Sequence, residues 1–260
     1  MKVVILCGGL GTRLREETEF RPKPMVKIGT RPILWHIMMI YAHYGFKDFV
    51  LCLGYKGEII KEYFYNYEIY NEDFCVHLGR SKKIELSRPN NTLNWNVWLV
   101  DTGEQALKGA RIKRIEHLID GDEFLLTYGD GVANIDIPRL LAFHRKHDKI
   151  ATVTGVRPPS LFGELQVRGE KVDLFVEKPQ TSSGLISGGF FVFSRRLFDR
   201  LTTDDGCDLE RGPLEDLARE GQLMVYDHGG DWACVDTYRD LQHLNQVWNA
   251  DNQAFWRVWE

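Results

Sequence analysis

The feature that most constrains the fold is an alternation of short apolar runs with amphipathic stretches, from the N-terminus to about Thr154. Lys2 to Cys7 is an apolar run that glycines end at once, which is typical of a buried parallel strand. Pro32 then opens a stretch with apolar side chains at helical spacing, and Gly45 ends it. Further strands are predicted at 49–53, 97–100, 123–128 and 151–154, and further helices at 58–67, 112–119 and 138–147.

This order predicts an α/β fold of the Rossmann-like kind, with a mixed, mostly parallel central sheet and helices on both faces. The remaining segments are shorter: strands are predicted at 74–78, 83–87, 165–167, 171–176, 190–193 and 223–226, and helices at 213–220 and 238–259. The sequence contains no linker, repeat or low-complexity segment, so we expect residues 1–260 to form one domain.

The loop after the first predicted strand carries most of the candidate chemistry. It reads Leu6-Cys-Gly-Gly-Leu-Gly-Thr-Arg13. Glycines there allow backbone N–H groups to approach a ligand closely, and Thr12 and Arg13 add a hydroxyl and a planar cation. Lys23 follows between two prolines, which stiffen the backbone. Two cations beside an amide-rich loop are typical of a polyphosphate site, and the alternative interpretation is a tight glycine turn with solvated charges, which is common for a glycine loop on its own.

Two better-known phosphate motifs do not fit this loop. A Walker loop needs a Gly-Lys-Ser/Thr ending, which is absent. A dinucleotide fingerprint needs a third glycine where the chain has Leu14, and an acidic residue after the second strand where it has Gly54. An oxidoreductase is therefore disfavoured, although it is the natural second class for this architecture.

Charge and cysteine content exclude other classes. The formal net charge of −4, from 33 Lys+Arg and 37 Asp+Glu, argues against a nucleic-acid partner. The longest uncharged run, 32–46, is shorter than the ~20 residues of a membrane span, and no signal peptide is visible, so we expect a cytoplasmic protein with no membrane partner. Five scattered cysteines predict free, mostly buried thiols.

Beyond the loop, ordered blocks along the whole chain resemble the sugar-phosphate nucleotidyltransferase family, and within it the cytidylyltransferases that act on glucose 1-phosphate. The loop with Lys23-Pro-Met25 carries the family signature. Further matching blocks are Pro32–Met38, Gly54–Gly57, Ile60–Phe64, Trp95–Val97, Leu99–Gly103, Thr127–Val132, Glu177–Pro179, Gly188–Val192 and Asp236-Thr237.

The resemblance implies a nucleotidyltransferase fold of the GT-A-like type, with a nucleotide-binding part at about 1–135 and a sugar-binding and C-terminal part at about 136–260. It implies that CTP and α-D-glucose 1-phosphate give CDP-glucose and pyrophosphate with Mg²⁺. In such a reaction the sugar-phosphate oxygen attacks the α-phosphorus in line, and the protein positions two anions and neutralises charge. It also implies a homo-oligomer and a place in surface-polysaccharide biosynthesis.

Site residues follow from the matched positions. Arg13, Lys23 and Asp130 are expected to be catalytic, with Arg13 on the leaving phosphates and Lys23 near the α-phosphate. Asp130 and Asp236 are expected to hold Mg²⁺, which prefers carboxylate oxygens. The expected nucleotide-binding residues are Leu6, Gly8, Gly9, Gly11, Thr12, Arg13, Lys23, Arg111 and Gly129, and those for the sugar phosphate are Gly163, Glu177, Lys178, Ser187 and Gly188.

Several positions depart from the family pattern. Cys7 and Trp98 replace alanine and threonine, Ser187 replaces an asparagine expected to bind the sugar, and 233–235 replaces a bulkier, more polar approach to Asp236. The serine has no amide with which to bind a sugar hydroxyl. Three functions therefore stay open: the CTP-dependent glucose 1-phosphate reaction, the same chemistry with another acceptor or with UTP or dTTP, and a non-catalytic sugar-nucleotide-binding regulator.

Overall fold

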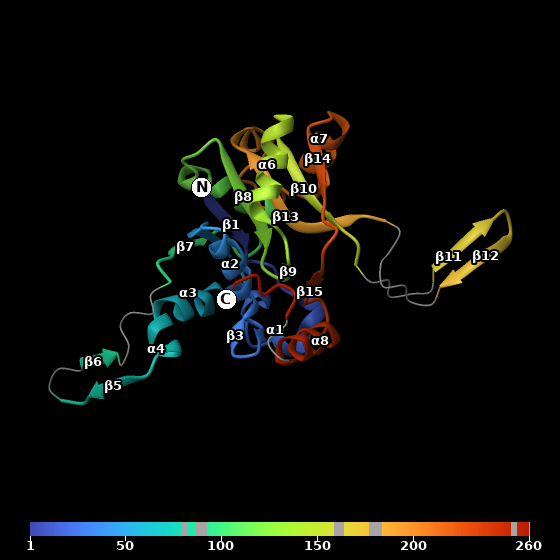
Figure 1. The fold of residues 1–260 in the computed structure, drawn as a ribbon. Helices are drawn as coiled ribbons and strands as arrows, with labels where there is room; N and C mark the ends of the chain where they lie inside the picture. The colour runs from blue at the N-terminus through green and yellow to red at the C-terminus, as the bar shows by residue number, and fades with distance from the viewer. Residues whose placement is uncertain (80–82, 87–92, 159–163, 177–183, 251–253, 260) are drawn as a thin grey trace.

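A computed structural model describes residues 1–79, 83–86, 93–158, 164–176, 184–250 and 254–259. Its centre is a seven-stranded sheet in the order β14-β10-β13-β8-β1-β4-β7 (Figure 1). The strands are β1 (Lys2–Leu6), β4 (Asp48–Leu53), β7 (Asn96–Asp101), β8 (Glu123–Tyr128), β10 (Ala151–Val156), β13 (Ile186–Ser194) and β14 (Leu223–Asp227).

The sheet is mixed and mostly parallel, as the alternation of elements predicts. β1 runs parallel to both β4 and β8, β4 runs parallel to β7, and β10 runs parallel to β14. Only β13 is antiparallel to its two neighbours, β8 and β10. The parallel half therefore gathers the carboxyl ends of β1, β4 and β8 at one edge, where open α/β sheets bind ligands.

Strand alternation divides the core into two layers. Val3 and Ile5 of β1 face α2 (Ile33–His43), α3 (Gly57–Tyr65), α6 (Ile137–His147) and α8 (Tyr238–Asn249). Val4 and Leu6 face the opposite layer, which contains α5 (Lys108–Arg114), a 3-10 segment η4 (Arg195–Arg200) and α7 (Glu215–Arg219). Both faces of the sheet are buried, which explains why β1 is apolar throughout its interior.

Shorter elements connect these layers. Between β1 and α2 lie η1 (Thr12–Leu14), α1 (Arg15–Thr18), η2 (Lys23–Met25) and the paired strands β2 (Lys27–Ile28) and β3 (Arg31–Pro32). β9 (Gly131–Ala133) pairs antiparallel with β15 (Trp232–Cys234). The remaining elements are α4 (Tyr67–Asn71), η3 (Glu116–Leu118) and a π-helical turn η5 (Glu210–Leu214).

Two hairpins lie away from the central sheet (Figure 1): β5 (Phe74–His77) with β6 (Lys83–Leu86), and β11 (Glu164–Arg168) with β12 (Lys171–Val176). In the described part of the chain, no helix is long and apolar enough to cross a membrane. All five cysteines are free, as predicted, but Cys75 is exposed rather than buried.

Three predicted helices have the wrong bounds. The helix expected at 112–119 runs from Lys108 to Arg114, because carbonyls of a distant loop, those of Asp205 and Cys207, accept from the amides of Leu107 and Ala110 at its start. The helix expected at 58–67 ends at Tyr65, and α4 follows it. The C-terminal helix ends at Asn249, and Trp256 is fully buried beside Trp248 and His36.

Candidate active site

The glycine-rich loop lines a cleft of about 490 Å³ at the carboxyl edge of the sheet. Leu6, Gly8, Gly9, Gly11, Thr12, Arg13, Lys23, Arg111, Gly129, Asp130 and Asp236 all line it. The structure thus brings every predicted nucleotide and metal residue to one cavity. Further lining residues, which the sequence analysis did not single out for the site, are Pro24, Ala106, Leu107, Lys108, Tyr128, Trp232 and Cys234, together with Cys7.

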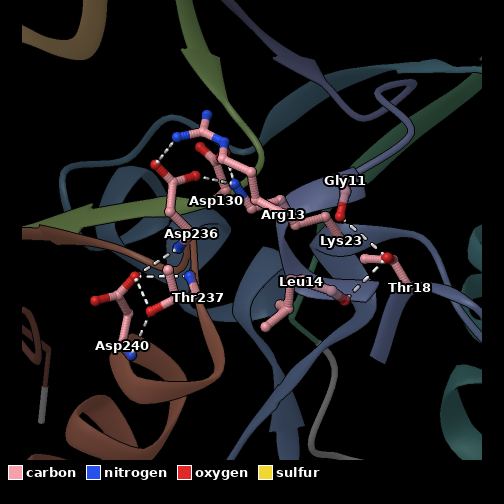
Figure 2. Close-up of polar contacts among 9 residues, drawn as sticks. All are labelled: Gly11, Arg13, Leu14, Thr18, Lys23, Asp130, Asp236, Thr237 and Asp240. Carbon is pink, nitrogen blue, oxygen red and sulfur yellow. Dashed lines mark hydrogen bonds and ion pairs between the residues drawn. The ribbon is translucent and has the colours of Figure 1, made fainter. Parts of the chain in front are cut away.

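The loop turns sharply at Gly11, which has a left-handed φ of 63° and precedes the 3-10 turn of Thr12–Leu14. A Cβ atom at Gly11 would lie 2.7 Å from the Thr18 methyl group, so both the backbone angle and the space require glycine. The Thr18 hydroxyl lies 3.0 Å from the Gly11 carbonyl oxygen and 2.9 Å from that of Leu14 (Figure 2). These contacts fix the turn that presents Thr12 and Arg13.

Arg111 lies beneath the loop and is 4% exposed. Its guanidinium donates to the carbonyls of Leu53 and Gly8 at 2.8 and 3.0 Å, to the Thr102 hydroxyl at 3.0 Å and to the Glu104 carbonyl at 3.2 Å. These four bonds join the end of β4 and the segments after β1 and β7 to α5. The observed role of Arg111 is therefore to hold the loop, and its expected contact with CTP phosphates stays a prediction.

Lys23, Asp130, Asp236 and Arg13 form a connected cluster of charges (Figure 2). The Lys23 ammonium donates to Asp130 Oδ2 and to Asp236 Oδ1, each at 2.6 Å. Arg13 donates to the other Asp236 oxygen at 2.8 Å. Asp130 and Asp236, which are far apart in sequence, thus face the same point from two sides.

Backbone pairing explains how the two carboxylates meet. Asp130 directly precedes β9 and Asp236 lies two residues beyond β15, and these strands pair with Cys234 opposite Gly131. The Val235 amide also donates to the Asp130 carbonyl at 2.9 Å. The N-terminus of α8 is capped by Thr237 and Asp240, which form a capping box (Figure 2). The Asp236 carboxylate is therefore left available for the cations.

Mutual pairing shifts the pKa of these groups. Burial lowers the pKa of Lys23, but the charges and hydrogen bonds of Asp130 and Asp236 outweigh it and raise that pKa above its ordinary value. Burial raises the pKa of Asp236, yet the bond to Lys23 and the charges of Lys23 and Arg13 bring it below its ordinary value. Both side chains are charged at neutral pH.

The two carboxylates fit a magnesium ion that also binds substrate phosphates. Both already contact one cation, the Lys23 ammonium, so a single ion can span the gap between them. Mg²⁺ commonly takes one or two protein carboxylates and completes its shell with water and phosphate. No cluster of three or more His, Cys, Asp or Glu side chains suited to a metal occurs among the described residues.

On the acceptor side, the structure places only part of the predicted set. Gly163, Glu177 and Lys178 lie outside the described residues. Ser187 is exposed on β13, opposite Gly155 of β10. Gly188 is buried beside it, and its carbonyl accepts a hydrogen bond from the Trp232 indole at 2.8 Å. Neither Ser187 nor Gly188 lines the cleft, but Trp232, which does, connects it to β13.

Cys234 also lines the cleft, between Trp232 and Asp236. Burial and the nearby carboxylates of Asp236 and Asp130 raise the pKa of this thiol to about 12. Cys234 is therefore a neutral thiol that lends the cluster no negative charge. The pairing of β9 with β15 was not predicted, because each strand has only three residues and its partner is about a hundred positions away.

A nucleotidyl transferase family model matches residues 2–247, and the chain belongs to this family. Among curated relatives, a glucose-1-phosphate cytidylyltransferase of Salmonella typhimurium is 47% identical over the full length of both chains. A probable glucose-1-phosphate cytidylyltransferase of Bacillus subtilis is 44% identical, again over both full lengths. The resemblance read from the sequence is thereby confirmed.

Solved structures confirm the fold class. HddC from Yersinia pseudotuberculosis aligns with a TM-score of 0.68 and 22% identity over 95% of this chain and 99% of that one. A UDP-glucose pyrophosphorylase complexed with UDP-glucose aligns with the same TM-score and 17% identity, over 96% and 98%. At these identities the likeness concerns the fold alone.

Proposed function

We propose that this chain transfers the cytidylyl group of CTP to α-D-glucose 1-phosphate, which gives CDP-glucose and pyrophosphate. The observation that carries the proposal is full-length identity of 44–47% to glucose-1-phosphate cytidylyltransferases, combined with a cleft that holds the predicted cations and carboxylates together. A non-catalytic regulator has no need for two carboxylates that converge on one cation-sized point.

The chemistry assigned to each group follows from its position. The loop amides of Gly8 to Thr12 bind the triphosphate. The exposed Arg13 guanidinium binds the leaving pyrophosphate and neutralises its growing negative charge. Lys23 neutralises charge on the α-phosphate as the sugar-phosphate oxygen attacks in line and the bond to the β-phosphate oxygen breaks. Arg111 keeps the loop in place for this step. No covalent intermediate with the protein is needed.

Asp130 and Asp236 are the residues that would hold Mg²⁺. The ion would supply Lewis-acid neutralisation of the phosphate oxygens. Lys23 would then exchange its carboxylate partners for phosphate oxygens, since one site accommodates one cation between the two carboxylates.

The proposal includes a cytoplasmic homo-oligomer that makes a sugar nucleotide for surface polysaccharide. Exposed aromatic side chains support self-association: Tyr65 is 89% exposed, Phe20 68% and Tyr70 57%. Aromatic residues are enriched at subunit interfaces. Light scattering coupled to size-exclusion chromatography tests the association, and a mass of one chain, 30.1 kDa, would contradict it.

The acceptor is tested by pyrophosphate release with CTP, Mg²⁺ and a panel of hexose 1-phosphates. We expect glucose 1-phosphate to give the highest kcat/KM. The replacement at Ser187 makes this panel informative, because a higher value with another hexose 1-phosphate would assign a different acceptor. Chelation of the metal is expected to abolish release, and added Mg²⁺ to restore it.

A further inference from the structure

The cleft crosses the edge of the sheet from one core layer to the other. Lys23, Asp130 and Asp236 lie at the end where Cys7, Met25 and Val235 enter the first layer. Ala106, Leu107, Lys108 and Tyr128 lie at the end formed by α5 and the second layer, which includes Ile112 and Leu209. A nucleotide whose phosphates occupy the Lys23 end can extend its base toward the α5 end, because both ends line the same cleft.

Lys108 is the charged group left to act at that end. Six charged side chains line the described part of the cleft: Arg13, Lys23, Lys108, Arg111, Asp130 and Asp236. Four of them form the charged cluster of Lys23, Asp130, Asp236 and Arg13, and Arg111 directs its hydrogen bonds to the loop that covers it. Lys108 is 42% exposed in its side chain, so a ligand can reach it.

Lys108 is also held in place. Its ammonium contacts Glu210 Oε1 and lies 5.1 Å from the centre of the Tyr128 ring. The Tyr128 hydroxyl donates to the same Glu210 oxygen at 2.5 Å. Burial and Glu210 raise the pKa of Tyr128, so this hydroxyl remains a donor. Glu210 thus anchors both the cation and the ring that forms a wall of the cleft.

We infer that Lys108, positioned by Glu210 and Tyr128, recognises the base of the nucleotide and favours cytosine over uracil. The inference rests on the proposed function. Cytosine presents two adjacent acceptors, O2 and N3, to an ammonium that has only donors. Uracil carries a hydrogen on N3, so this nitrogen is a donor and cannot accept a hydrogen bond from the ammonium. A donor placed at this edge therefore stabilises bound CTP and disfavours UTP.

The test compares kcat/KM for CTP and UTP in wild type and Lys108→Met. We expect the CTP preference to fall at least about tenfold, the loss of one charged hydrogen bond. Glu210→Gln should lower it less, and Lys108→Arg, which keeps a donor cation, should preserve it in part. Lys113→Met is the matched control on α5, because Lys113 pairs with Glu116 and does not line the cleft.

A Lys108→Met variant that loses CTP and UTP turnover by the same factor would overturn the inference and make Lys108 a phosphate contact. A Lys108→Met variant whose kcat/KM is unchanged for both nucleotides would also overturn the inference. An unchanged CTP-to-UTP ratio of kcat/KM in Glu210→Gln would show that Glu210 does not position Lys108. Should Lys108→Met not fold, Lys108→Ala, which also removes the donor, gives the same comparison. Wild type that turns over neither nucleotide contradicts the proposed function instead, so the two failures are distinguishable.

Discussion

At the scale of single residues, the site depends on one ammonium shared by two carboxylates. Asp130→Asn should lower kcat with Mg²⁺ by about a thousandfold, because one of two metal ligands is lost. Steady-state pyrophosphate release checks this. Glu220→Gln, which breaks an exposed pair with Arg200 far from the cleft, should retain wild-type turnover. Turnover of the Asp130→Asn enzyme near wild type would remove Asp130 from the metal site.

The charged cluster also predicts how stability depends on pH. Because the folded-state pKa of Asp236 is lowered, its pairing stabilises the fold above its ordinary pKa of 3.8 and is lost as pH falls through the folded-state pKa. The raised pKa of Lys23 acts oppositely: its contribution is complete below its ordinary pKa of 10.5 and is lost as pH rises through the folded-state pKa.

Urea unfolding at a series of pH values checks this dependence. Wild type should lose free energy of unfolding as pH falls below about 4, and Asp236→Asn should lose less over the same window. Parallel curves for the two proteins would show that the carboxylate of Asp236 is not paired in solution.

At the scale of elements, the loop after β1 is held by α5 through Arg111. A Cβ atom at Gly8 would lie 2.1 Å from the Arg111 guanidinium, and one at Gly54 would lie 2.4 Å from it. Gly8→Ala and Gly54→Ala should each destabilise the fold by about 2 kcal/mol or more, since a buried, bonded cation would be displaced.

Gly9→Ala is the matched control for stability, because nothing lies within 4 Å of the added carbon. Thermal unfolding of the three variants is the measurement. A melting temperature for Gly8→Ala equal to that of Gly9→Ala would contradict the packing of Arg111 under the loop.

The Trp232 indole links β15 to β13. Trp232→Phe removes the hydrogen bond to the Gly188 carbonyl and should cost about 1 kcal/mol of stability. Because this bond joins the cleft to β13, which carries Ser187 and Gly188 of the predicted sugar-phosphate set, we expect KM for the sugar phosphate to rise more than KM for CTP. Equal changes in both constants would show that Trp232 serves the nucleotide as well.

At the scale of the whole molecule, local patterns predicted the fold well and distant contacts poorly. Buried strands such as β1 and β8 end in glycines or lie in apolar runs, so their class and order could be read directly. The start of α5 could not, because its amides bond to a loop about a hundred residues further on. The hydrogen bonds from Arg111 to the carbonyls of Leu53 and Gly8 could not be predicted either, because the sequence shows this arginine only in a basic helix; its expected contact with phosphates stays a prediction.

In the site, too, local motifs could be read from the sequence, whereas contacts between distant residues could not. Motif positions predicted Arg13, Lys23, Asp130 and Asp236 in one place, because each follows a recognisable segment. The ion pair of Lys108 with Glu210 beside the cleft was not predicted, since a lysine at a helix start and a glutamate in an acidic loop resemble ordinary surface charges until the fold joins them. The acceptor residues Gly163, Glu177 and Lys178 stay predictions.

The most direct test of CDP-glucose synthesis incubates the full chain with glucose 1-phosphate, Mg²⁺ and each of CTP, UTP, dTTP and ATP in turn. The sugar nucleotide is identified by mass, and the released pyrophosphate is measured. We predict CDP-glucose and pyrophosphate in equal amounts, with CTP giving the fastest release. Release that is fastest with UTP or dTTP, or absent with every nucleotide, would contradict the account.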